Sequence, residues 1–330
     1  MKISYIFRTQ SLQRSIERVF EPIIENMKVE GYDVDVEFAE LYSHVLVSLW
    51  KNMCYFRKVS KKNLCHITGD VQYVACLMNP KNTVLTIHDL APLHNKNVPW
   101  YAKFLCYWLW YYIPLRRLKT VTCISEATRQ DLISFFPWAK QKISVIPNPI
   151  DPAFHYVHKE FNMDCPTILH IGTKPNKNLL RVIEALDGLK CHLRIIGKLN
   201  DDYLAALDKH HIDFSNEFGI SDEQIIKEYE QCDIVSFPSL FEGFGMPIIE
   251  AQTVGRVVVT SNIEPMKSVG GDSVQLSEPN DVCSIRESFE AVICNQQLRE
   301  YIISAGLKNA SMYSSKEISK LYNNIYKRHI

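Results

Sequence analysis

The stretch DIVSFPSLFEGFGMPIIEAQTVGRVVVTS, residues 233–261, decides the fold class that the sequence predicts. It opens with an apolar, strand-like run, passes through a glycine-containing turn, and continues as a helical pattern from Pro247 to Gly255. Proline suits the first turn of a helix and glycine suits the position after its end. A second apolar run, RVVVTS at 256–261, follows directly. Strand, helix and strand in this order favour a parallel sheet covered by helices.

The same alternation runs through the whole chain. Strand-like runs occur at 2–8, 33–39, 82–90 and 120–125 in the first half, and at 167–173 and 191–198 in the second. A length of 330 residues favours two domains. We therefore predict an α/β protein with two doubly wound, mainly parallel domains, residues 1–150 and 151–330, joined near the proline-rich segment 147–166. The helical pattern at 314–330 is a candidate to pack back on the first domain.

Composition excludes several classes of function. Lys and Arg together number 37, as do Asp and Glu, so the formal charge is zero and gives no sign of nucleic-acid binding. Ten cysteines without a CxxC pair are typical of buried thiols in a reducing compartment. The longest apolar run, residues 104–115, is shorter than the roughly 20 residues that span a membrane. We expect a cytoplasmic protein.

The glycine turn of the opening stretch is a candidate anion site. Gly243, Phe244 and Gly245 directly precede a helix, where free amide groups and the helix dipole favour negative charge. Glu250 lies about one turn into that helix, and its carboxylate can accept hydrogen bonds from vicinal hydroxyls such as those of ribose. Glu242 lies in the loop. The alternative is a plain glycine turn with two solvated glutamates, and this pattern alone leaves both readings open.

Lysines follow two neighbouring predicted strands of the second half. Lys174 and Lys177 come after the strand at 167–173, and Gly197 and Lys198 end the strand at 191–198. Carboxyl ends of parallel strands share one edge of a sheet, so these cations could neutralise a diphosphate there. Each lysine taken singly is equally well explained as a solvated surface residue.

These segments together resemble the retaining glycosyltransferases of family 4. The motifs that carry the resemblance are SLFEGFGMPIIEA (an E-x7-E signature), IGTKPNKNL, IIGK, CISEAT and VIPNPID, which occur in the family's order over more than half of the chain. The resemblance implies the GT-B fold of two facing Rossmann-like domains. It also implies transfer of a sugar, as in a hexosyltransferase, from a nucleotide diphosphate sugar to an acceptor hydroxyl in surface polysaccharide or glycolipid assembly.

The resemblance assigns roles on the donor side. Glu250 would hold the ribose hydroxyls, Glu242 would contact the donor sugar, and Lys177 would contact the diphosphate. Thr173 or Asn176 stands where the family often has an arginine, so Lys198 or Lys174 would supply the second cation. The backbone of the turn after each strand, and the loop that borders the nucleobase, complete the expected donor site: Gly172, Gly243, Phe244, Gly245 and Ile220.

The first half would supply the acceptor side. His88, in LTIHDL, is expected to face the donor sugar and is preferred to His66 for that role. A histidine after a strand is otherwise a hydrogen-bonded structural residue. The family's glycine-rich loop after the first strand is absent, and the residues expected to line the acceptor side are Arg8, Arg14, Ser15, Asp70 and Asp89.

The expected chemistry uses no metal ion and no other cofactor. Lysines and a helix N-terminus can stabilise the leaving diphosphate by themselves, and the loops after the strands carry no Asp-x-Asp motif. Retention of the anomeric configuration follows from the resemblance. It would proceed through a covalent carboxylate intermediate or through front-face attack, and the sequence does not distinguish these routes.

The aromatic segment Val98–Thr120 raises the question of a membrane. Its aromatic residues end in Arg116, Arg117 and Lys119, a composition that suits the inner face of a membrane and a glycan or lipid-linked acceptor. The alternative is a helix buried against the first sheet with its basic end in solvent. Two rival functions also remain: another GT-B enzyme such as a nucleotide-sugar 2-epimerase, and a non-catalytic nucleotide-sugar-binding homologue.

Overall fold

A computed structural model of the chain describes residues 1–9, 15–40, 45–95 and 97–329. The chain divides into two compact units. Unit 1 comprises Met1–Asp151 and Ser315–Ile330, and unit 2 comprises Pro152–Ser314. Each unit is built around one sheet of six parallel strands, so the predicted α/β class with two doubly wound domains is confirmed.

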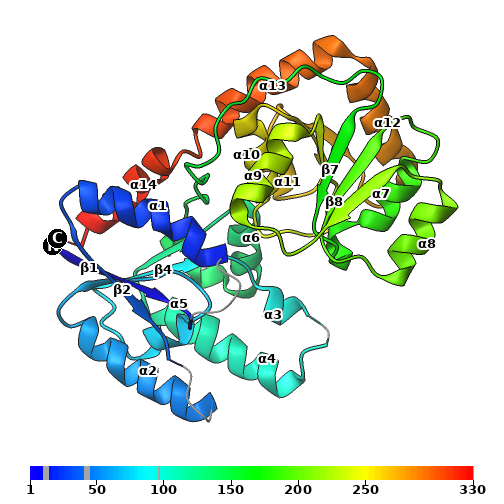
Figure 1. The fold of residues 1–330 in the computed structure, drawn as a ribbon. Helices are drawn as coiled ribbons and strands as arrows, with labels where there is room; N and C mark the ends of the chain where they lie inside the picture. The colour runs from blue at the N-terminus through cyan, green and yellow to red at the C-terminus, as the bar shows by residue number, and fades with distance from the viewer. Residues whose placement is uncertain (10–14, 41–44, 96, 330) are drawn as a thin grey trace. The chain divides into compact units, whose positions relative to one another are not determined.

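Unit 1 is drawn from blue to teal in Figure 1, with its last helix in red. Its strands are ordered β2-β1-β3-β4-β5-β6. Their bounds are β1 Lys2–Phe7, β2 Asp33–Phe38, β3 Leu64–Ile67, β4 Thr83–Ile87, β5 Thr120–Cys123 and β6 Ile143–Val145. The α-helices are α1 Ser15–Val29, α2 Val45–Val59, α3 Ala91–His94, α4 Trp100–Cys106, α5 Ile113–Arg117, α6 Glu126–Phe135 and α14 Ser315–Lys327. A 3₁₀ turn η1 (Gln72–Cys76), a π-helical turn η2 (Tyr107–Tyr112) and a second 3₁₀ turn η3 (Pro137–Lys142) connect them.

Unit 2 has the strand order β12-β11-β10-β7-β8-β9. The strands are β7 Thr167–Ile171, β8 His192–Ile196, β9 Phe214–Glu217, β10 Ile234–Phe237, β11 Val257–Ser261 and β12 Gln275–Ser277. The α-helices are α7 Leu179–Ala185, α8 Asp201–Lys209, α9 Asp222–Gln231, α10 Met246–Val254, α11 Met266–Gly270, α12 Val282–Cys294 and α13 Gln296–Ser311, with a 3₁₀ turn η4 at Pro175–Lys177.

Alternating side chains place apolar groups on both faces of the sheet in unit 1. Ile3, Tyr5 and Phe7 of β1 pack with α1 and α14 on one face, whereas Ile6 belongs to the cluster formed with α2, η1 and α5 on the other. In unit 2 the strands supply Ile168, Leu193, Ile195 and Val257 to a core closed by α7, α8 and α12. Both faces of each sheet are thus covered, which leaves the strand ends for a site.

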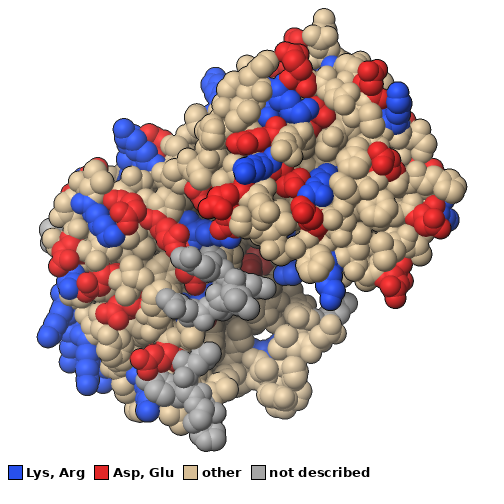
Figure 2. Space-filling view, viewed as in Figure 1, with Lys and Arg blue, Asp and Glu red and all other residues tan. Residues whose placement is uncertain are grey.

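Each sheet has one point at which the strand order reverses direction. In unit 1 this point lies between β1 and β3, and in unit 2 it lies between β7 and β10. The loops that leave two such strands diverge to opposite faces, and the opening between them is where doubly wound proteins bind ligands. On the face drawn in Figure 2, acidic and basic side chains of the described residues are intermixed. Anion binding would therefore depend on local lysines and amide groups.

Candidate functional site

Lys177 and Glu242 meet at the reversal point of unit 2. Lys177 ends the 3₁₀ turn η4 after β7, and Glu242 lies in the loop after β10. The Lys177 ammonium group donates to Glu242 Oε1 at 2.7 Å and lies 4.6 Å from the centre of the Phe237 ring. Both side chains are about four-fifths buried, at 19% and 16% exposure. A cation and a carboxylate predicted from separate motifs thus form one partly buried pair.

Asn176 fixes this pair from the side. Its side-chain nitrogen Nδ2 donates to Glu242 Oε1 at 3.2 Å and to the Phe241 carbonyl at 3.0 Å. Its backbone carbonyl accepts from the Leu240 amide. The loop after β10 is therefore tied to the turn after β7 through backbone and side chain. Glu242 Oε1 receives two donors, which sets the orientation of the carboxylate.

In the turn after β7, the Lys177 side chain lies close against the backbone of Gly172. Gly172 has φ +95°, and a Cβ atom there would lie 3.1 Å from Cγ of Lys177. Thr173 donates its hydroxyl to the Lys198 carbonyl at 2.8 Å, and its own carbonyl accepts from the Tyr203 hydroxyl at 2.9 Å. The Thr173 side chain thus joins the ends of β7 and β8. Thr173 is one of the two residues at the place where the family often has an arginine. The Lys198 side chain is exposed at the same edge.

The glycine turn forms the N-terminus of α10, as its sequence predicts. Gly245 is the capping residue with φ +114°, Pro247 lies in the first turn, and Gly255 follows the last residue. The Phe244 ring is buried against Tyr313 at 5.8 Å, so only its backbone is available to a ligand. Ile220 is partly buried and lies between β9 and α9, at the same edge of the sheet.

Glu250 lies on α10 and has a partner that the sequence did not indicate. The hydroxyl of Tyr229, on α9, donates to Glu250 Oε2 at 2.5 Å. Tyr229 is fully buried, and burial followed by the nearby Glu250 charge raises its pKa well above the ordinary value. A buried tyrosine in a helical pattern looks like any core residue, so only the strand order, which brings α9 beside α10, reveals this contact.

The residues predicted for the acceptor side lie on unit 1. Arg8 follows β1 and Asp70 follows β3, and their side chains form an ion pair of 2.7 Å across the reversal point. Ser15 begins α1, with its hydroxyl 3.4 Å from the Arg8 guanidinium. Glu17, which the sequence did not single out, is a buried carboxylate 3.9 Å from Arg8 Nε. Arg14 lies outside the described residues.

His88 follows β4 and is held by the loop after β3. Its Nε2 lies 2.7 Å from the Thr68 carbonyl and must donate to it, which leaves Nδ1 as the acceptor of the neutral ring. Burial lowers its pKa, against the opposing effect of the Thr68 carbonyl. Gly69 lies so close that a Cβ atom would be 2.7 Å from Cδ2 of the imidazole. Asp89 accepts from the amide of Ala91, the first residue of α3, at 2.9 Å.

His66, in β3, is a core residue. Its two ring nitrogens contact the Tyr326 hydroxyl at 2.5 Å and the Thr86 hydroxyl at 2.7 Å, inside unit 1.

Among the described residues, no group of three or more His, Cys, Asp or Glu side chains is arranged to hold a metal ion. Over that same part of the chain, no helix combines the length and apolar character that crossing a bilayer requires.

Two family models match the chain. Residues 157–309 match "Glycosyl transferases group 1", and residues 63–154 match "Glycosyltransferase Family 4". The serotype-specific mannosyltransferase WbdA of Escherichia coli is 24% identical over 267 residues, which are 71% of this chain and 32% of that protein. The O-antigen chain mannosyltransferase B of E. coli is 25% identical over 63% of this chain and 60% of its own length. The chain thus spans 32% and 60% of the length of these two relatives.

Solved structures agree with the fold over nearly the whole chain. A glycosyltransferase from Rickettsia africae ESF-5 has a TM-score of 0.76 at 18% identity and covers 99% of this chain and 98% of its own. Alr3699/HepE from Anabaena, solved in complex with UDP and glucose, has a TM-score of 0.76 at 15% identity and covers 98% and 99%. At these identities the similarity concerns the fold alone.

Proposed function

Since the chain belongs to the GT-B glycosyltransferases of the family 4 type, we propose that it transfers a sugar from a nucleotide diphosphate sugar to an acceptor hydroxyl. The observation that carries the proposal is the grouping of charged side chains at the reversal point of unit 2. There, Lys177 and Glu242 form a partly buried pair at the same sheet edge as the N-terminus of α10. Glu250 lies about one turn along that helix. An ammonium group and free amides suit a diphosphate, and carboxylates suit sugar and ribose hydroxyls.

The proposed roles follow from the contacts. The Lys177 ammonium group has three donors, of which the bond to Glu242 uses one, so it can also bind a phosphate oxygen. Lys198 at the neighbouring strand end and the amides before α10 add positive charge, which stabilises the leaving diphosphate without a metal ion. The backbone of Gly172, Gly243 and Gly245 can approach the donor closely.

Retention of configuration belongs to the proposal as well. Glu242 Oε1 already accepts from Lys177 and Asn176, which withdraws electron density from this oxygen. We therefore favour front-face attack, assisted by the departing phosphate, over a covalent intermediate on Glu242. His88 is proposed to contact a sugar hydroxyl through Nδ1, because its Nε2 is bound by the Thr68 carbonyl.

The acceptor is proposed to be a glycan or a lipid-linked glycan of a surface polysaccharide. The support comes from the relatives, two of which are named as serotype-specific and O-antigen mannosyltransferases. Asp70 and Asp89 follow neighbouring strands of unit 1, and their carboxylates are suited to accept from sugar hydroxyls.

A thermal-shift screen tests the donor assignment. A ligand that binds only the folded protein raises the melting temperature by mass action. We expect a stabilising shift with at least one nucleoside diphosphate and its sugar, and a smaller shift with Glu250→Ala. No shift with any nucleoside diphosphate would favour the non-catalytic rival or a different ligand class.

We further propose a peripheral contact between unit 1 and an anionic membrane face. The predicted aromatic segment is divided: Tyr111 and Leu115 enter the core, whereas Trp100, Tyr101 and Phe104 are 79%, 64% and 60% exposed. Neither α2 nor the segment from α4 to α5 contains an acidic residue, and both contain Lys or Arg. The first turns of α2 add exposed Leu46 and Trp50, at 72% and 62%.

Exposed aromatic groups beside cations suit a lipid headgroup region. In a flotation assay we expect binding to vesicles with anionic lipid, and weaker binding by the Trp50→Ser/Phe104→Ser variant. If the wild type stays in the unbound fraction with both neutral and anionic vesicles, the membrane contact is excluded.

A further inference from the structure

The contact between Tyr229 and Glu250 joins two helices of unit 2. Tyr229 is in the last turn of α9, and Glu250 is in the middle of α10. The 2.5 Å hydrogen bond ends on a carboxylate, and such charge-assisted bonds are the stronger kind. A buried tyrosine with a raised pKa stays protonated at any working pH. The bond therefore persists whenever Glu250 is ionised.

Tyr229 is itself fixed from two sides. The Phe154 ring packs edge-on against the Tyr229 ring, with the ring centroids 5.5 Å apart. The Tyr229 carbonyl accepts from Arg256 Nε at 3.0 Å. A phenol held at both its ring and its backbone has little freedom to follow a moving carboxylate. The carboxylate must instead adapt to the phenol.

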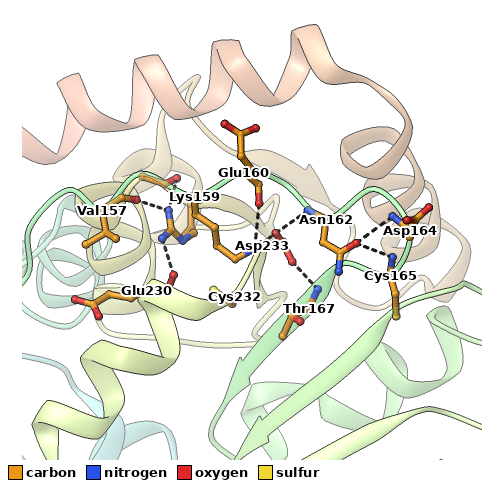
Figure 3. Close-up of polar contacts among 12 residues, drawn as sticks. Val157, Lys159, Glu160, Asn162, Asp164, Cys165, Thr167, Glu230, Cys232 and Asp233 are labelled. Atoms are coloured by element: carbon orange, nitrogen blue, oxygen red, sulfur yellow. Dashed lines mark hydrogen bonds and ion pairs between the residues drawn. The ribbon is translucent and has the colours of Figure 1, made fainter.

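Arg256 supplies the anchorage behind Tyr229. It is 3% exposed and donates to backbone carbonyls at the ends of α9 and α10 and in the segment of unit 2 that precedes β7: Tyr229, Glu230, Val254, Gly255 and Val157. Two of these partners, Val157 and Glu230, are labelled in Figure 3. Carbonyls at a helix C-terminus lack intrahelical partners, so one guanidinium caps both helices. The distance between α9 and α10 is thereby set.

The segment before β7 is also held by Asp233, which is labelled in Figure 3. Asp233 precedes β10, is 4% exposed, and accepts from Lys159, from the Asn162 amide at 3.1 Å and from the Thr167 amide at 2.8 Å. These three donors satisfy the buried Asp233 carboxylate, so its role is structural. This contact and the Arg256 contacts fix the frame on which Tyr229 rests, at the edge of the sheet opposite the proposed donor site.

We propose that Tyr229 is the positioning residue for ribose recognition: its hydroxyl orients the Glu250 carboxylate so that it accepts from the vicinal hydroxyls of the nucleotide. The inference rests on the proposed function and extends it by one residue. The Glu250 carboxylate stands on two methylene groups, so ordering it to bind a diol costs conformational entropy. Fixing one oxygen in advance removes most of that cost. Tyr229 does not touch the nucleotide in this account and acts through Glu250.

Calorimetric titration of the full chain with UDP and GDP, and with their 2′-deoxy forms, tests the proposal. The wild type should bind the better of the two ribonucleotides more tightly than its 2′-deoxy form. Tyr229→Phe keeps the ring against Phe154 and removes only the hydroxyl. We expect it to weaken ribonucleotide binding roughly tenfold, in line with a hydrogen bond to a charged group. Binding of the deoxy form should change little, so the ratio between the two falls.

Tyr5→Phe is the matched control. Tyr5 is also fully buried, and its hydroxyl contacts Tyr326 within unit 1. Its loss should lower the melting temperature and leave the ratio between ribonucleotide and deoxynucleotide unchanged. In a Glu250→Gln background, Tyr229→Phe should have no further effect on that ratio, because both substitutions interrupt the same interaction.

Three results would overturn the proposal in distinguishable ways. Wild-type binding without any preference for ribose, or no nucleotide binding at all, would remove the proposed function on which it rests. Ribonucleotide affinity and ribose preference that both survive Tyr229→Phe would reject Tyr229 alone and leave the donor site intact. Equal weakening of ribo and deoxy forms would assign Tyr229 to packing. If Tyr229→Phe fails to melt cooperatively, Phe154→Leu, which loosens the packing of the Tyr229 ring and leaves Glu250 unchanged, must show the reduced ratio instead.

Discussion

At the scale of single residues, the proposed donor site depends on one ammonium group. Lys177 is held by a carboxylate and by the face of the Phe237 ring, so the position of its charge is fixed before a ligand arrives. A fixed charge loses little freedom when a diphosphate binds, and it needs no reorganisation as negative charge grows on the leaving group. Lys198, by contrast, is an exposed side chain whose charge is screened by water.

Replacement of Lys177 should therefore cost far more than replacement of a surface lysine. We expect Lys177→Ala to lower kcat/KM by roughly 10²- to 10³-fold, as loss of a transition-state charge contact does, while the protein still folds. Lys190→Ala is the matched control, because Lys190 is exposed before β8 at the opposite edge of the same sheet. Steady-state kinetics with the donor from the thermal-shift screen would decide. Equal activity of the two variants would remove Lys177 from the site.

Several residues of the site could be named from the sequence, and others could not. Lys177, Glu242 and Glu250 stand in motifs whose helix and strand grammar indicates an anion and hydroxyls. The partner of Glu250 could not be found, because Tyr229 comes 21 positions earlier and meets it only through the packing of α9 on α10. The use of Thr173 to join two strand ends was hidden for the same reason.

At the scale of elements, α14 shows how a helix far along the chain completes a core. Ile318, Tyr322 and Tyr326 are buried against α1 and β1 of unit 1. The Tyr326 hydroxyl contacts both His66 and Tyr5, so buried polar groups of β1 and β3 are satisfied from the last helix. Unit 1 would otherwise expose these groups along one face of its sheet.

Two positions on α14 test this packing. Ile318→Ala should lower the free energy of unfolding by about 2–4 kcal/mol, since Ile318 is fully packed between α1 and the sheet. Leu321→Ala, three residues on, removes a side chain that is 43% exposed and should cost under about 1 kcal/mol. Urea unfolding monitored by circular dichroism gives both values. Similar losses at the two positions would show that α14 is not docked as described.

Periodicity explains which elements the sequence predicts well. The central strands and their helices have long apolar patterns with clear ends, such as Ser125, whose hydroxyl accepts from the Thr128 amide at the start of α6. The edge strands β9 and β12, with sequences FSNE and QLS, are short and polar and carry no such pattern. The sequence pattern does not indicate helix α2 clearly, because apolar residues occur on its exposed as well as its buried side.

At the scale of the whole molecule, the two units are variations of one design. Unit 2 runs β9-β8-β7-β10-β11-β12, the order of dinucleotide-binding sheets, whereas unit 1 runs β2-β1-β3-β4-β5-β6, the order of flavodoxin-like sheets. An ion pair of 2.7 Å spans the reversal point in each unit: Arg8 with Asp70, and Lys177 with Glu242. The strand–helix alternation predicts two doubly wound sheets, but strand order depends on long-range packing that no local pattern encodes.

Acid should destabilise both units. His66 in unit 1 and His170 in unit 2 are fully buried, and burial lowers the pKa of each to about 3. In the unfolded chain their pKa is near the ordinary value of 6.5, so between about pH 6.5 and 3 the unfolded state binds more protons. Stability therefore falls as pH falls through that window, by about 2 kcal/mol per histidine at pH 5.

Comparison of urea unfolding at pH 7.5 and pH 5 measures this effect. His170→Gln should lose about 2 kcal/mol less than the wild type over that interval. His158→Gln is the control, because it removes a histidine whose side chain is 72% exposed in the folded protein. If His170→Gln and the wild type lose the same free energy, His170 is not a neutral buried group.

The most direct test of the central claim is acceptor-dependent release of nucleoside diphosphate. The wild type is incubated with the nucleotide sugar found in the thermal-shift screen, with and without a glycan or lipid-linked acceptor, and both the nucleotide and the sugar are followed. We predict that nucleoside diphosphate appears in quantity only with the acceptor, that the sugar is transferred to the acceptor with retained anomeric configuration, and that Lys177→Ala is nearly inactive. Equal release without acceptor, or conversion of the sugar to its 2-epimer, would contradict the claim.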